Sequence, residues 1–281
     1  MSRQATSEEA TYLLRGLGRS RGGYAALCAG VALLCLTAFS SSGTGAEVSD
    51  VIQRIKGSVV AVGTYERTRS PAFSFRGTGF VIGDGSLVAT NAHVLPPVID
   101  DERHEALVIA VPGPTPTSPA MVRTGKTLVI DQEHDLALVR IDGPKLPALA
   151  LGDSAHVREG QSLLLTGFPI GAVLGLIPAT HRAMVSALTP IAIPTGNAQE
   201  LEPRAIKRLT ATPYPVIQLD GTAYPGNSGS PLYDPETGEV VGIVNSVAVK
   251  ATRESALSQP SGISFAIPAQ PLKNLLQSIN K

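Results

Sequence analysis

The chain has little cysteine and no tryptophan. Its two cysteines, Cys28 and Cys35, both lie in an apolar run near the N-terminus, so the chain after residue 46 has no thiol. That absence excludes disulfides and thiolate metal sites from this larger part. Exported domains of animals are usually stabilised by disulfides, so a cysteine-free exported domain is more typical of a bacterial envelope protein.

Net charge is lacking as well. The 23 basic and 23 acidic residues cancel, which removes any general electrostatic reason to bind nucleic acid or acidic membrane surfaces. We therefore predict no nucleic-acid partner. Aromatic residues are only 4% of the chain, whereas glycine (28) and proline (22) are plentiful between short runs of Val, Ile and Leu. This mixture is typical of an all-β domain with many turns.

The first 46 residues differ from the rest. Basic residues are followed by an apolar run over residues 24–39 and a stretch of small residues over 40–46. This is the layout of an export signal, and the run is short for a membrane span. We predict an exported protein of the bacterial periplasm or cell envelope. Residues 1–46 are either a cleaved signal peptide or a retained inner-membrane anchor.

The remaining chain, residues 47–281, is predicted to form two β-barrels and a C-terminal helix. Six predicted strands form a first group: residues 59–64, 77–82, 87–91, 106–111, 127–130 and 136–141. Six more form a second: residues 162–167, 183–188, 216–219, 230–233, 240–247 and 263–267. Two such groups predict two packed six-stranded barrels over about 57–145 and 160–268. A helix follows over 269–280, with Leu272, Leu275, Leu276 and Ile279 on one face. Residues 190–215 are predicted to be a long surface loop.

The most informative short segment is residues 226–231, Gly-Asn-Ser-Gly-Ser-Pro. A serine between glycines can present its hydroxyl and nearby backbone N–H groups to one point, as acyl transfer requires. Ser228 is therefore the candidate nucleophile, although clusters of this composition also form ordinary turns. Ser230 competes with it, but Pro231 restricts the backbone of Ser230.

A serine hydroxyl needs a base, and His93 is the best candidate among five histidines. It ends an apolar strand, whereas His104, His134, His156 and His181 lie in polar or loop contexts. Asp135 directly precedes a buried strand and could accept a hydrogen bond from the Nδ1–H of a histidine, fixing its tautomer. A structural histidine and a turn aspartate are the alternative interpretations.

The order of these residues separates folds that carry the same chemistry. His93 comes first, Asp135 second and Ser228 third, and no histidine follows His181. The Ser–Asp–His order of α/β-hydrolases is therefore excluded, and a subtilisin order conflicts with the predicted strands. The order His–Asp–Ser is that of double-β-barrel serine proteases.

Motifs spread along the chain carry a resemblance. In order they are residues 77–82 (GTGFVI), 88–94 (VATNAHV), 135–138 (DLAL), 165–169 (LTGFP), 218–220 (QLD), 226–232 (GNSGSPL), 242–245 (GIVN) and 262–268 (GISFAIP). With these, the chain resembles trypsin-like serine proteases of the chymotrypsin fold, and among them the bacterial HtrA/Deg branch. It shows no PDZ-like segment after the protease-like part. Ser230 stands where that branch usually has a second glycine.

The resemblance implies a serine endopeptidase in envelope protein processing or quality control. His93 would be the base, Asp135 its orienting acid and Ser228 the nucleophile. The backbone N–H groups of Gly226 and Ser228, helped by Asn227, would form the oxyanion hole. It further implies polypeptide substrates and allows a homo-oligomer.

The specificity pocket is expected around Thr222, Tyr224, Ile243 and Asn245. Thr222 stands where digestive relatives that cleave after Lys or Arg have an aspartate, so a basic P1 residue is not expected. Small or medium apolar P1 residues are predicted instead. We predict no cofactor and no metal. Two alternatives stay open: a catalytically silent protease-like binding protein, and an acyl esterase on the same fold.

Overall fold

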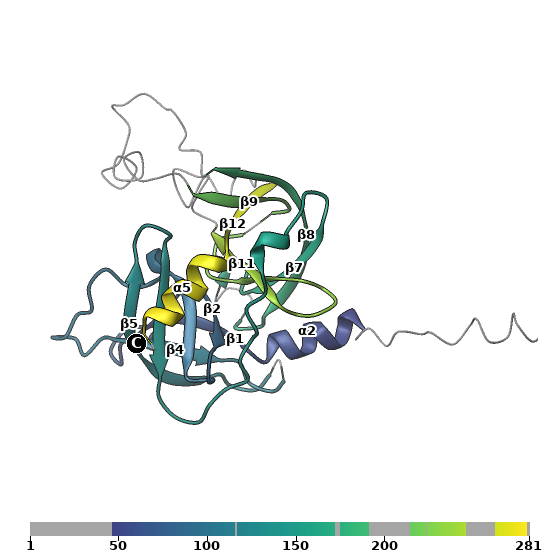
Figure 1. The fold of residues 1–281 in the computed structure, drawn as a ribbon. Coiled ribbons are helices and arrows are strands. Elements are labelled where there is room, and N and C mark those ends of the chain that lie inside the picture. Colours follow the sequence, from purple (N-terminus) through teal and green to yellow (C-terminus); the bar gives the residue numbers. More distant parts are fainter. Residues whose placement is uncertain are drawn as a thin grey trace, which may run out of the picture. The chain divides into compact units, whose positions relative to one another are not determined.

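The described part of the chain is mostly strand, with an α-helix near each of its ends (Figure 1). It contains twelve strands, two α-helices and two short 3-10 helices. The computed structural model describes residues 47–115, 117–171, 175–190, 214–222, 224–245 and 262–279. The predicted export signal or anchor therefore lies outside the described residues, and so does most of the predicted loop 190–215. Among the helices that are described, none has the length and apolar character needed to cross a membrane.

The first six strands close into one antiparallel barrel in the order β1-β2-β3-β6-β5-β4. Their bounds are β1 Val59–Tyr65, β2 Phe73–Ile82, β3 Leu87–Asn91, β4 Ala106–Val111, β5 Met121–Asp131 and β6 Leu136–Ile141. Buried Val, Ile and Leu side chains from these strands fill the barrel, among them Val60, Val81, Ile109 and Val139. A short 3-10 helix, η1 (Ala92–Val94), directly follows β3.

The other six strands close into a second barrel in the order β10-β11-β12-β9-β8-β7. Their bounds are β7 Ser162–Gly167, β8 Ala179–Pro190, β9 Pro215–Asp220, β10 Pro231–Tyr233, β11 Val240–Asn245 and β12 Ile263–Pro268. Its interior is equally aliphatic, with Leu163, Val185, Leu219 and Val244 fully buried.

A third apolar cluster joins the two barrels and the helices. Phe80 and Leu138 of the first barrel belong to the same buried cluster as Phe168 and Ile243, which come from the second half of the chain. Helix α2 (Val48–Lys56) adds Val51 and Ile55, and helix α5 (Ala269–Ser278) adds Leu272. Helix α5 contacts β11 and β12 of the second barrel.

The predicted fold class is confirmed: an all-β, double six-stranded barrel of the chymotrypsin type with a C-terminal helix. Three strands are longer than predicted, since β2, β5 and β8 begin four to six residues earlier than expected. The added residues are mostly exposed or half-buried, and backbone pairing with neighbouring strands holds them in place. Because these added residues are not a continuous apolar run, the sequence pattern does not reveal them as strand. Strand β11 is described only as far as Asn245, so the predicted residues 246 and 247 lie outside the described part.

Candidate active site

The structure brings His93 and Asp135 into direct contact. Strands β3 and β6 are antiparallel neighbours, and Asn91 at the end of β3 pairs with Leu136 at the start of β6. His93 follows β3 and Asp135 precedes β6, so both side chains leave the barrel at the same edge. The distance from His93 Nδ1 to Asp135 Oδ2 is 2.6 Å. Because a carboxylate can only accept, Nδ1 carries the proton, which leaves Nε2 as the basic nitrogen.

Asp135 is held by several donors. Its Oδ1 accepts the backbone N–H of His93 at 2.9 Å, and its Oδ2 also accepts the Asn245 side-chain amide at 2.8 Å. Its carbonyl accepts from the Asn91 side chain and the Ala92 N–H, each at 3.0 Å. The residue is buried and has a left-handed φ of 54°. A non-glycine residue in that conformation is strained, and such strain is concentrated at functional sites.

Ser228 lies in the loop that leads into β10, next to the end of β11 that carries Asn245. Its carbonyl accepts the Thr78 N–H at 2.9 Å, and the N–H of Gly229 donates to Val244 O at 2.9 Å. Val244 is the residue before Asn245, so the nucleophile loop and the Asp135 carboxylate are anchored to adjacent positions of β11. Ser228 itself is 5% exposed.

A tight turn precedes the serine. The Asn227 N–H donates to Tyr224 O at 3.0 Å, and Gly226, the third residue of this turn, has φ 102°. Proline at the second position keeps a negative φ, so this is a type II β-turn, which requires glycine at the third position. The Pro225 carbonyl accepts the Ile170 N–H at 2.8 Å. In a trans peptide the N–H points opposite to the C=O, so the Gly226 N–H faces away from Ile170.

The peptide between Asn227 and Ser228 is anchored in the same way. The Asn227 carbonyl accepts the Ser230 N–H at 3.0 Å, which directs the Ser228 N–H to the opposite side of that peptide. No group among the described residues accepts from the Gly226 N–H. The bonded carbonyls of Pro225 and Asn227 thus hold the two peptides that carry the N–H groups of Gly226 and Ser228. Donors held in place in this way can form a pre-organised oxyanion hole.

Three of the other expected site residues are buried. The backbone N–H of Asn227 donates to Tyr224 O inside the turn, and its side-chain amide lacks a hydrogen-bond partner among the described residues, so its help in the oxyanion hole stays a prediction. Ile243 is fully buried in the shared core, and the amide of Asn245 donates to Asp135, so their place in the specificity pocket stays a prediction too. Thr222 and Tyr224 are half-buried. Side chains on the inward face of β11 serve the core and the carboxylate, which the spacing from Ser228 does not reveal.

Ser230, the competing serine, is fully buried, and its hydroxyl lacks a hydrogen-bond partner among the described residues. A side chain at Gly167 would collide with this hydroxyl. The serine that replaces the expected second glycine is therefore accommodated by a glycine on β7.

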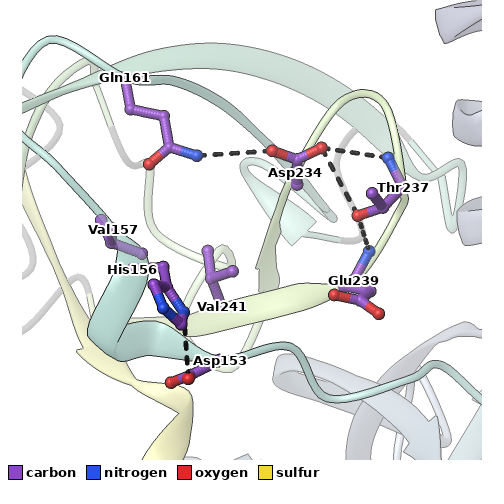
Figure 2. Close-up of a pocket in the computed structure, with 8 residues that line it drawn as sticks. All are labelled: Asp153, His156, Val157, Gln161, Asp234, Thr237, Glu239 and Val241. Atoms are coloured by element: carbon purple, nitrogen blue, oxygen red, sulfur yellow. Dashed lines mark hydrogen bonds and ion pairs between the residues drawn. The ribbon is translucent and has the colours of Figure 1, made fainter.

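Two other histidines pair with carboxylates away from this site. His134 Nδ1 lies 2.7 Å from Asp131 Oδ2. Figure 2 shows a polar pocket in which His156 pairs with Asp153 at 3.1 Å, and none of the eight residues that line it is a serine or cysteine. Each of these histidines pairs with an aspartate only three residues away, so we interpret both pairs as local structural contacts.

His181 lies closer to the oxyanion turn. Its ring centroid is 6.2 Å from that of Tyr224, the first residue of the turn. Burial lowers the pKa of His181 below its ordinary value, because desolvation disfavours the imidazolium. No group of three or more potential metal ligands occurs among the described residues.

Residues 77–243 match the family of the trypsin-like peptidase domain. The chain belongs to the trypsin-like peptidase family. Its curated relatives include Serine protease HTRA1B of Danio rerio, which is 30% identical over 82% of this chain. Another is the "Probable periplasmic serine endoprotease DegP-like" of Marinomonas sp. (strain MWYL1), 30% identical over 72% of it. This peptidase spans 40% and 35% of the lengths of these two relatives.

Solved structures show the same likeness. The HtrA-type protease AlgW with tripeptide is 25% identical and matches with a TM-score of 0.58, over 83% of this chain and 63% of that one. The resemblance to the HtrA/Deg branch is thereby confirmed.

Proposed function

We propose that this trypsin-like peptidase is a serine endopeptidase that cleaves polypeptides through an acyl-enzyme. The observation that carries the proposal is the 2.6 Å contact between His93 Nδ1 and Asp135 Oδ2, at the barrel edge adjoining the Ser228 loop. It supplies an oriented base, and the Ser228 loop is anchored to the same strand, β11, whose Asn245 holds the Asp135 carboxylate. The curated relatives are named as serine proteases, which supports the same chemistry.

In this mechanism, Ser228 Oγ attacks the scissile carbonyl while His93 Nε2 takes its proton. Asp135 keeps the imidazole oriented and stabilises the imidazolium that forms. The negative oxygen of the tetrahedral intermediate is bound by the N–H groups of Gly226 and Ser228. His93 then protonates the leaving amine, and a water activated by the same nitrogen releases the acid from Ser228.

A fluorophosphonate probe tests this function directly, because it phosphonylates an activated serine. We expect labelling of the wild type at Ser228, and loss of labelling and casein hydrolysis by several orders of magnitude in Ser228→Ala and His93→Ala. Ser230→Ala is the matched control and should still be labelled. An unlabelled wild type would support a silent binding protein, and labelling without casein or peptide cleavage would support an esterase.

The place of action is proposed as the bacterial envelope. Support comes from the export-signal layout of residues 1–46 and from the relative named as periplasmic. Mass spectrometry of the protein from fractionated cells tests this. An N-terminus near residue 47 in the periplasm indicates a cleaved signal, and an intact N-terminus in membranes indicates an anchor. An intact chain in the cytoplasm would contradict export.

Substrate preference is proposed from Thr222, which is half-buried and uncharged. A neutral residue at that position offers no partner for a Lys or Arg side chain, so we propose small or medium apolar P1 residues. Cleavage of a peptide library mainly after arginine would overturn this preference.

A further inference from the structure

Thr78 of β2 is fully buried. Its hydroxyl, backbone N–H and carbonyl all form hydrogen bonds with residues outside β2. Its hydroxyl donates to Gly226 O at 2.6 Å and accepts the Phe168 N–H at 3.1 Å. Its backbone N–H donates to Ser228 O at 2.9 Å, and its carbonyl accepts the Thr90 hydroxyl at 2.7 Å. One threonine of the first barrel therefore contacts three separate segments around the candidate active site.

The hydroxyl fixes one peptide of the oxyanion turn. A threonine hydroxyl has a single proton, and here it points to Gly226 O because the Phe168 N–H occupies the acceptor side. The same Gly226–Asn227 peptide donates its N–H to Tyr224 O at 3.0 Å. The C=O and the N–H of this peptide are thus both hydrogen-bonded, which holds Gly226 at its left-handed φ.

The backbone of Thr78 fixes the other side of the loop. Its N–H holds the carbonyl of Ser228, and the Gly229 N–H of that same peptide donates to Val244 O. The carbonyl of Thr78 is bound by Thr90, which lies on β3 three residues before His93. The strand that leads to the base and the loop of the nucleophile are thereby connected through one residue.

We propose that Thr78 is a positioning residue for the oxyanion hole, acting through its hydroxyl on the Gly226 peptide. The proposal rests on the proposed function, because it assumes that the N–H groups of Gly226 and Ser228 bind the developing oxyanion. It goes beyond the triad, since Thr78 touches neither substrate nor the reacting atoms.

The packing around the hydroxyl agrees with this role. Gly77 and Gly79 on either side of Thr78 have no room for a side chain, because an added Cβ would lie 2.7 Å from Val94 or Val88. Across the barrels, a Cβ at Gly167 would lie 3.0 Å from the Thr78 hydroxyl. Neighbours that approach so closely leave the hydroxyl little freedom to leave Gly226 O.

The test compares Thr78→Val with Thr78→Ser. Valine keeps the shape of threonine but removes both hydroxyl bonds, so Gly226 O and the Phe168 N–H lose their partner. Oxyanion stabilisation acts in the transition state, and losing one donor costs roughly a hundredfold to a thousandfold in rate. For this indirect change we expect the limiting rate of fluorophosphonate labelling to fall at least about tenfold. Half-saturation by the probe should stay within about twofold, and Thr78→Ser should restore most of the rate.

Thr166→Val is the matched control. Thr166 is also fully buried, and its hydroxyl also has two partners, Thr180 and Tyr233, each at 2.8 Å. We expect Thr166→Val to lower the melting temperature without slowing the labelling step. Equal slowing in the two valine variants would overturn the proposal, and so would wild-type labelling by Thr78→Val. If Thr78→Val does not fold, Thr78→Ala removes the same bonds without adding bulk.

Failure of this inference differs from failure of the proposed function. If the wild type is labelled at Ser228 and Thr78→Val is labelled equally fast, only the role of Thr78 is lost. If the wild type is not labelled at all, the endopeptidase proposal itself fails.

Discussion

At the scale of single residues, Asn245 shows the largest difference between the role expected from the sequence and the contact found in the structure. Its distance along the chain from Ser228 suggests a pocket wall, yet its side chain donates to Asp135 Oδ2 at 2.8 Å, in a buried contact across 110 residues. The same oxygen faces His93 Nδ1. The amide of Asn245 thus orients the carboxylate that in turn orients His93.

Replacing this amide with a carboxylate gives a test specific to charge. Asn245→Asp is nearly isosteric, but two carboxylates at hydrogen-bond distance repel each other unless they share a proton. We expect labelling by the fluorophosphonate to be slower than in the wild type. Asn245→Ser, which keeps a donor, is the control. Labelling of Asn245→Asp at the wild-type rate would contradict the assigned contact.

At the scale of structural elements, the turn over residues 224–227 decides whether the site is assembled. Type I and type II turns differ by a flip of the central peptide, and only the type II form needs a positive φ at its third position. Gly226 meets that need with φ 102°, and its added Cβ would collide with the carbonyl of Phe168. The left-handed φ of Gly226 therefore goes together with the orientation of its N–H, the candidate oxyanion donor.

Gly226→Ala should disturb this turn specifically. Alanine is strained at such a φ, by about 1–2 kcal/mol, and here it also collides with backbone, so we expect the turn to flip and labelling to fall roughly a hundredfold. Gly160→Ala is the matched control, because Gly160 has φ 82° but nothing within 4 Å of an added Cβ. Thermal melting and labelling rates are measured for both. Equal labelling by the two variants would disprove the role given to the turn.

At the scale of the whole molecule, the two barrels share a buried cluster, so the site between their edges depends on the stability of the whole. The half-buried His181 of the second barrel adds a dependence on pH. Its Nε2 is buried without a partner among the described residues, and burial lowers its pKa in the folded protein. The unfolded chain therefore takes up this proton at a higher pH than the folded one does.

The contribution of His181 to the free energy of unfolding is therefore complete at pH values above its unfolded pKa, about 6.5 for a free histidine. It declines as the pH falls through that value. We expect the melting temperature to drop less between pH 7.5 and 5.5 in His181→Gln than in the wild type. His104→Gln is the control, since His104 is exposed. An equal drop in wild type and His181→Gln would contradict the buried, neutral imidazole.

Local sequence patterns were sufficient to predict the barrel architecture and to select His93, Asp135 and Ser228 as candidates. Strand periodicity and turn residues act over short distances, and the order of three residues excludes other folds without any coordinates. The packed fold was needed to show that Asn245 bonds to the carboxylate and that Ile243 lies in the core. It also joined Thr78 to Gly226 across 148 residues. The Asn245 and Thr78 contacts cross between barrels, and no local pattern encodes which buried polar group meets which partner once the barrels pack.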